Sequence, residues 1–215
     1  MVTVEALVLG GHIAAGVVAL LAGLGALLTT KGGLRHRQAG NIYVVAMGVV
    51  VGTVVPLFAL APTDPTRQFL LLVAVFSGYL AFSGYRVLAR KRPADAAESV
   101  DWAGAVLVVA ACAGLGVLGG SRLVGGDSFG LVLLVFGFIG GTFGVLDLKT
   151  FWTDAAEAWV VSHLTRMVSA FIATVTAVSV VNLTMVPAVV AWLWPTAVGV
   201  PLIVYWQRVY GRESA

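Results

Sequence analysis

Long apolar runs separated by short polar connections constrain the fold of this chain more than any other feature. Apolar residues make up 60% of the 215 residues and charged residues 11%, whereas about a quarter of a soluble domain is charged. A helix needs roughly 20 apolar residues to cross a hydrocarbon core about 30 Å thick. The sequence therefore predicts an all-α, polytopic membrane protein: a single bundle of about seven transmembrane helices without a soluble domain.

Polar and glycine-rich breaks set the expected limits of these helices. The first run follows a segment without basic residues and is too long for the core of a signal peptide, so we expect it to be a retained helix. Aromatic and charged residues mix in KTFWTDAAEAW, which favours a short stretch at the membrane interface. The predicted helices cover about residues 5–28, 40–60, 68–89, 101–119, 129–148, 158–181 and 188–206.

The distribution of basic residues predicts the orientation of the bundle. If alternate connections lie on opposite sides, only Arg67 and Arg122 of the 13 lysines and arginines fall on one side. The positive-inside rule makes the other side cytoplasmic, with the N-terminus outside and the C-terminus inside. The eleven residues on that side are Lys31, Arg35, Arg37, Arg86, Arg90, Lys91, Arg92, Lys149, Arg166, Arg208 and Arg212.

The chain lacks the residues that several classes of function require. The lone Cys112 allows neither an intramolecular disulfide nor a cluster of thiolate ligands. The basic residues form no contiguous patch, so we expect no nucleic-acid partner. No lysine lies in the last predicted helix to form a retinal Schiff base. No nucleophile or phosphate-loop motif favours an enzyme, and the question of catalysis stays open.

His12 is a candidate ligand residue within the first predicted helix. Small residues follow it at helical spacing, including Gly16, Ala19 and Gly23. Such a face allows another helix or a flat ligand to approach closely. His12 is therefore either a ligand-binding or haem-ligating residue, or a histidine hydrogen-bonded across a helix interface.

A second group of polar residues is expected on the cytoplasmic side. Titratable groups within a bilayer are expensive, so they are natural functional candidates. This group suggests a site for an anionic headgroup, a quinone or a proton path, with arginine as the cation and histidine as the titrating group. Its members are His36, Arg37, Tyr43, Asp147, His163 and Arg166.

Anchoring residues are the alternative interpretation of the same side. Long charged side chains near helix ends often extend toward the headgroups or form loop salt bridges, and this interpretation is favoured for Lys149, Asp154 and Glu157. Arg166 lies about two turns inside its helix, which favours a functional role or a specific buried pair.

Haem is the cofactor that these histidines could hold. Two axial histidines must lie at one depth on different helices, and at about 1.5 Å rise per residue only His36 and His163 match. His12 lies toward the opposite side, so a three-histidine zinc site is not expected and no metal centre is predicted.

Two stretches carry a resemblance to a known family. The first places His12 on one helix and His36-Arg37 with Gly40 before the next, and the second is WVVSHLTRMVSAFIATVTA. They resemble the predicted membrane proteins catalogued as domain of unknown function 2306, while residues 60–128 add nothing recognisable. The resemblance implies a multi-pass protein of the prokaryotic inner membrane and no particular reaction. It points to His12, His36, Arg37, Gly40, His163, Arg166 and Met167.

Three functional hypotheses follow. The leading one is a membrane-embedded protein that binds a small ligand, a lipid or quinone headgroup, or a proton through histidine and arginine. The second is a redox protein with b-type haem. The third is a non-catalytic partner subunit or pore. The expected partners are membrane lipid, a small-molecule ligand, and a second copy or another membrane subunit.

Overall fold

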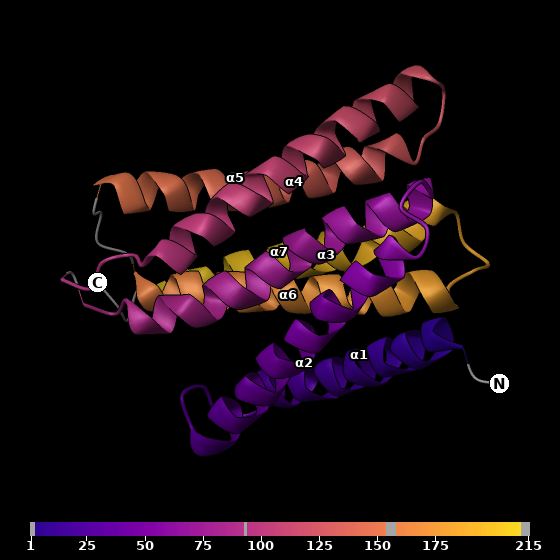
Figure 1. The fold of residues 1–215 in the computed structure, drawn as a ribbon. Helices are drawn as coiled ribbons and strands as arrows, with labels where there is room; N and C mark the ends of the chain where they lie inside the picture. The colour runs from indigo at the N-terminus through magenta and orange to yellow at the C-terminus, as the bar shows by residue number, and fades with distance from the viewer. Residues whose placement is uncertain (1–2, 93, 154–157, 212–215) are drawn as a thin grey trace. The chain divides into compact units, whose positions relative to one another are not determined.

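Seven α-helices make up most of the computed structural model, which describes residues 3–92, 94–153 and 158–211. Each is long and apolar enough to cross a membrane, so the prediction of a multi-pass helical protein is confirmed at that level (Figure 1). A 3₁₀ turn, η1 (Val87–Ala89), follows the third helix. The helices are α1 (Val4–Leu28), α2 (Leu34–Ala59), α3 (Pro65–Arg86), α4 (Ser99–Val124), α5 (Gly130–Thr153), α6 (Trp159–Asn182) and α7 (Ala188–Gly211).

Four helix limits differ from the sequence expectation by five residues or more, and one of them is the end of α7, at Gly211 and not at about residue 206. Helix α2 begins at Leu34 and not at Gly40, because the chain turns at Gly32, whose φ of 74° suits glycine, and Gly33 is the N-cap. Helix α4 continues beyond the predicted Gly119 to Val124. Helix α5 continues through Lys149–Thr153, the first part of the expected interfacial stretch. Asp154 and Glu157 lie outside the described residues.

The chain divides into two compact units, Met1–Ala74 and Val75–Ala215, with the boundary inside α3. In unit 1, α1 and α2 pack side by side (Figure 1). Small residues allow the contact, since a methyl group on Gly25 would lie 3.8 Å from the Cβ of Ala39. At the start of α3, Arg67 pairs with Glu5 at 2.7 Å and donates to the Leu57 carbonyl. One side chain thus joins the ends of α1, α2 and α3.

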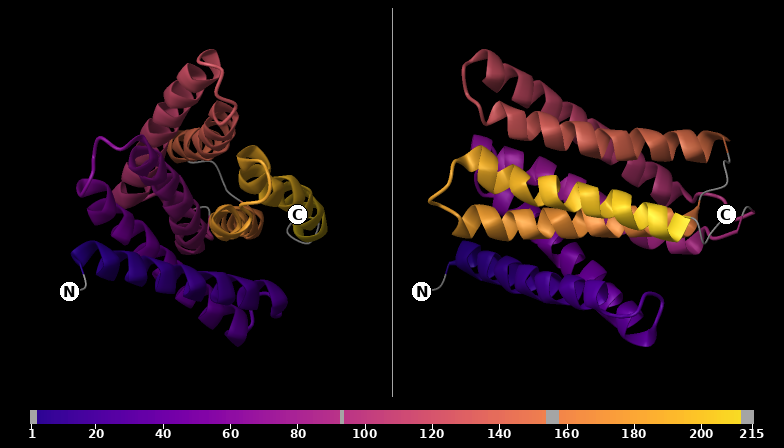
Figure 2. Two further views of the ribbon diagram at one scale, coloured as in Figure 1. Left: turned by 90° about the vertical axis from the view of Figure 1, so that its right-hand side faces the viewer. Right: turned by 180° about the vertical axis from the view of Figure 1, so that it is seen from behind.

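Unit 2 contains the rest of α3 and two helix pairs, α4 with α5 and α6 with α7. Both views of Figure 2 show the members of each pair side by side. Helices α4 and α5 approach closely at glycine, because a Cβ on Gly137 would lie 2.9 Å from the Cys112 carbonyl oxygen. Cys112 itself is a buried free thiol. The absence of a side chain at Gly137 thus lets the backbones of α4 and α5 approach each other closely.

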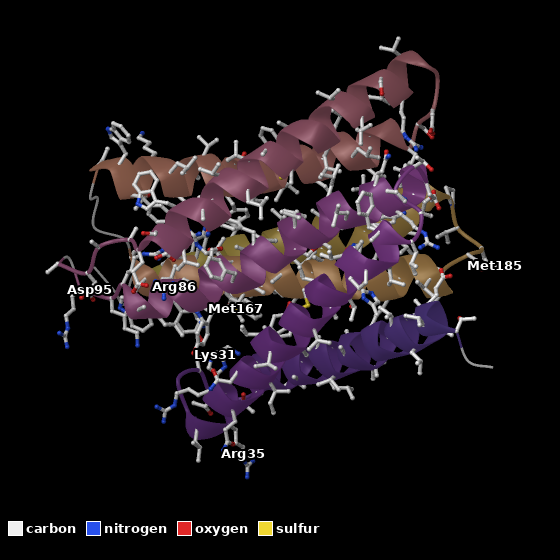
Figure 3. All side chains as sticks on the ribbon, in the orientation of Figure 1. Lys31, Arg35, Arg86, Asp95, Met167 and Met185 are labelled. Atoms are coloured by element: carbon white, nitrogen blue, oxygen red, sulfur yellow. The ribbon has the colours of Figure 1, made fainter. Side chains whose placement is uncertain are left out.

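The buried charged side chains described for unit 2 lie toward one end of it. Helix α3 ends there at Arg86, α4 begins, α5 ends and α6 begins. Figure 3 shows Arg86 at this end and Met185, in the α6–α7 turn, at the other end of the unit. The candidate site lies at the Arg86 end.

Candidate functional site

A buried carboxylate, Asp147, is the centre of what we call the inner cluster (Tyr79, Asp147 and Arg166). Arg166 donates from Nη1 and Nη2 to the two carboxylate oxygens, and the Tyr79 hydroxyl donates to Oδ2. Their relative exposures are 5% for Tyr79, 1% for Asp147 and 6% for Arg166. A bidentate arginine and a phenol donor leave the carboxylate fully hydrogen-bonded.

The inner cluster lies within the membrane-spanning helices. Asp147 lies before the last turn of α5, Arg166 follows the first turns of α6, and Tyr79 precedes the last turn of α3. At about 1.5 Å per residue, each group is roughly 10 Å from its helix end. Isolated charges at this depth are expensive, so opposite charges must pair there.

Gly84 of α3 brings the predicted α6 motif against α3. The His163 ring donates from Nδ1 to the Gly84 carbonyl at 2.8 Å, because a carbonyl can only accept. A methyl group on Gly84 would lie 2.9 Å from Met167 Sδ and 3.0 Å from Arg166 Cβ. The absence of a side chain at Gly84 therefore sets how Arg166 approaches α3.

A second group of charges surrounds Asp101 at the start of α4. This outer cluster (Arg86, Arg90, Glu98 and Asp101) has a carboxylate that is 2% exposed. Arg86 donates to both Asp101 oxygens at 2.9 Å, and Arg90 lies 2.8 Å from Oδ1. Glu98 adds a 3.2 Å ion pair to Arg86, and its backbone N–H donates to Asp101 at 2.9 Å. The buried Asp101 carboxylate thus interacts with two arginines and also caps the start of α4.

Aromatic rings connect the two clusters. The Arg90 guanidinium lies 4.9 Å from the ring centroid of Phe151, which is one turn beyond Asp147 on α5. The Tyr79 ring would lie 3.4 Å from a Cβ on Gly104, one turn beyond Asp101 on α4. Arg90 of the outer cluster thus contacts the part of α5 that carries Asp147, and Tyr79 of the inner cluster contacts the part of α4 that carries Asp101.

His12 in unit 1 forms a hydrogen bond between α1 and α2. Its Nδ1 lies 2.9 Å from Thr53 Oγ1, and the same hydroxyl donates to the Val49 carbonyl at 2.8 Å. The His12 tautomer sets the direction of this hydrogen bond, because the ring Nδ1 and the hydroxyl can each donate or accept. His12 thus makes the hydrogen bond across a helix interface that was one of its two interpretations; the other was a ligand-binding or haem-ligating role.

The α1–α2 turn holds the other predicted residues of unit 1. His36 lies in the first turn of α2 and donates from Nδ1 to the Ala26 carbonyl at 3.0 Å. Lys31 donates to the Ala26 and Leu27 carbonyls, and desolvation lowers its pKa below the ordinary value. Arg37 is exposed and Tyr43 is buried. Lys31 and His36 thus cap the carbonyl end of α1.

The predicted residues therefore separate into two groups. Asp147, His163 and Arg166 lie in unit 2, whereas His12, His36, Arg37 and Tyr43 lie in unit 1. The two haem-ligand candidates, His36 and His163, belong to different units. Within the described ranges, no three His, Cys, Asp or Glu side chains are grouped to hold a metal ion.

Sequence reasoning missed part of the site. It did not select Tyr79 or Asp101, and it treated Arg86 and Arg90 only as basic residues of the cytoplasmic side. A usable signal was present, since Tyr79, Arg86 and Arg90 recur at the spacing of one helix face along an apolar segment. Lys149, in contrast, is exposed on α5, as expected for an anchoring residue.

A small cavity lies between α3, α5, α6 and α7 in unit 2. Its volume is about 30 Å³, and its lining includes Phe76, Phe136 and Ile172 with the hydroxyl residues Ser169 and Thr176. That volume accommodates about one or two water molecules, whereas a pocket for a drug-sized ligand measures roughly 300–1,000 Å³. The cavity is too small for a quinone ring or a haem.

No family model, curated protein or solved structure matches this chain.

Proposed function

We propose that this chain is a membrane-embedded binding protein whose ligand is a proton, taken up by Asp147 of the inner cluster. The observation that carries the proposal is a buried aspartate, 1% exposed, held by Arg166 and Tyr79 within membrane-spanning helices. Ionisable groups at such depth commonly mark ion and proton pathways.

A proton suits this geometry better than an anionic headgroup or a quinone. Both terminal nitrogens of Arg166 are engaged by Asp147, so an anion would have to displace a carboxylate that the fold already places there. The small cavity between α3, α5, α6 and α7 holds no more than about two water molecules. A proton needs no such room, because it binds directly to a carboxylate oxygen.

Proton uptake would change the contact between α3, α5 and α6. Once Asp147 is neutral, the positive charge of Arg166 loses the charge that compensates it. Arg166 Cβ lies against the position of Gly84, so a movement of Arg166 acts on the α3–α6 contact. Protonation is thereby converted into a rearrangement of helices.

The outer cluster gives the route and the side of access. Arg86 and Arg90 lie at the end of α3 and just beyond it, and Asp101 lies in the first turn of α4, while Arg90 contacts Phe151, one turn beyond Asp147 on α5. The positive-inside rule places this end in the cytoplasm and the N-terminus outside. We therefore propose that Asp147 exchanges protons with the cytoplasmic side of a prokaryotic inner membrane. The resemblance to domain of unknown function 2306 adds His163, Arg166 and Met167 to the same region.

Infrared spectroscopy at different pH values tests the proposal. A protonated carboxyl group has a C=O stretch that the carboxylate lacks, so acidification of the purified protein should produce this band. Asp147→Asn should remove the contribution of Asp147 to this band. The control Asp127→Asn should keep that contribution. Asp127 is a surface residue, paired with Arg122 at 3.0 Å. A spectrum that Asp147→Asn leaves unchanged, over the whole range in which the protein stays folded, would exclude Asp147 as the proton site.

A b-type haem protein is the second candidate, favoured by one observation. His36 and His163 each donate Nδ1–H to a backbone carbonyl, as haem- and metal-ligating histidines commonly do. An optical spectrum of protein purified from haem-supplemented cells decides it, since a stoichiometric Soret band supports haem and its absence rejects it.

A further inference from the structure

The α1–α2 turn of unit 1 carries positive charge without nearby acids. Lys31, Arg35 and Arg37 lie within seven residues of sequence, and no aspartate or glutamate occurs between Glu5 and Asp64. The first turn of α2 contains no acidic residue, and Gly33 provides no side-chain cap. Figure 3 shows Lys31 and Arg35 at this turn. Within unit 1, its charge is therefore uncompensated.

The two arginines of the turn differ from Lys31 and His36. Lys31 and His36 donate to carbonyls of α1. Arg35 and Arg37 are exposed, and neither has a side-chain hydrogen bond or ion pair within the described part of the chain. Two exposed guanidinium groups thus lie in the first turn of α2.

Apolar side chains flank these guanidinium groups. Leu28 ends α1 and is 78% exposed, and Leu34 begins α2 and is 64% exposed. Both lie at the ends of helices that are apolar enough to span a membrane. The turn therefore places exposed arginines beside exposed leucines where a helix meets the headgroup level.

We propose that this turn binds the phosphate of an anionic phospholipid headgroup through Arg35 and Arg37. The planar guanidinium matches a phosphate oxygen pair, and basic residues next to a membrane span attract anionic lipids. The exposed leucines lie where the acyl chains of the same lipid begin, which favours a lipid over free phosphate. The proposal is independent of the proton site in unit 2.

Lipid binding to the full chain in neutral detergent tests this site. Native mass spectrometry measures binding of phosphatidylglycerol and of phosphatidylcholine, which carries a phosphate without net charge. Wild type should prefer phosphatidylglycerol, and Arg35→Gln/Arg37→Gln should weaken its binding about tenfold or more, from the contribution of each cation near a lipid surface. Arg35→Lys/Arg37→Lys should retain most of the binding.

Two controls make the result specific. Arg92→Gln/Arg122→Gln removes the same net charge elsewhere and should leave binding unchanged. Equal binding of the two lipids, an equal loss in this control, or no loss in the Arg35/Arg37 variant would overturn the proposal. Competition by inorganic phosphate at matched ionic strength would overturn the lipid assignment, because a free anion would then satisfy the site.

Discussion

The buried arginines of unit 2 and the two arginines of the α1–α2 turn in unit 1 have different surroundings. In unit 2, Arg166 is 6% exposed and forms an ion pair with the buried Asp147. Arg90 is 9% exposed and forms an ion pair with the buried Asp101. In unit 1, Arg35 and Arg37 are exposed and have no acid nearby in sequence. Burial explains the difference, because a charge that leaves water must acquire a partner. The positive-inside rule counts all of these arginines alike, although, among the described residues, the buried ones are paired with acids and the exposed ones are not.

The largest expected effect comes from breaking the inner pair. Arg166→Ala or Asp147→Ala leaves one buried charge without its partner, which typically destabilises a protein by about 3–5 kcal/mol. The free energy of unfolding, measured by denaturation in mild detergent, should fall accordingly.

The control for this prediction removes both charges together. Asp147→Leu/Arg166→Met replaces the pair with apolar side chains and should recover much of the stability lost in either single variant. A loss of less than about 1 kcal/mol in the single variants, as for exposed ion pairs, would contradict the buried character of the pair.

The Tyr79 hydroxyl should have the next largest effect. Tyr79→Phe removes one hydrogen bond to the Asp147 carboxylate, and a hydrogen bond to a charged group contributes about 1.5–3 kcal/mol. The same unfolding measurement applies. Tyr85→Phe is the matched control on α3, because Tyr85 is 46% exposed and should be nearly neutral. Equal effects of the two variants would remove Tyr79 from the cluster.

A methyl group at Gly84 should disturb the α3–α6 contact less strongly. Gly84→Ala places a Cβ 3.0 Å from Arg166 Cβ, and overpacking typically costs about 1–3 kcal/mol, partly offset by the helix preference for alanine. Thermal unfolding checks the loss. At Gly116 on α4 a methyl group meets nothing within 4 Å, so Gly116→Ala should be neutral or stabilising. The reverse order of the two variants would refute the close approach.

The smallest expected effect belongs to unit 1. Arg35→Gln should change the free energy of unfolding in neutral detergent by no more than about 0.5 kcal/mol, as for most surface substitutions. A loss as large as that of Arg166→Ala would mean that Arg35 has a structural partner, and the contrast between the units would fail.

The helices could be predicted from the sequence because length and hydropathy determine them. The start of α2 was predicted too late, because Gly32 and Gly33 end the turn before His36 and Arg37, whose charges were assigned to the loop. Lateral packing was harder to predict. The helices are apolar on all sides, so periodicity does not show which face meets a neighbour.

The candidate site was predicted only in part for the same reason. Asp147, His163 and Arg166 were selected because polar residues in apolar segments are conspicuous. Their partners were not evident, because Tyr79 lies on a helix remote in sequence and the carbonyl of Gly84 has no side-chain signature. The family resemblance and the membrane orientation stay predictions.

Hydrogen exchange in α6 is the most direct test of the proposal that protonation of Asp147 changes the contact between α3, α5 and α6. The amides around His163 and Arg166 are measured at neutral and acidic pH, with correction for the intrinsic exchange rates. In the wild type, acidification should increase exchange in this segment. Asp147→Asn should show the increased exchange already at neutral pH and respond little to acid. Wild-type exchange that does not change with pH, together with equal protection in Asp147→Asn, would contradict the account.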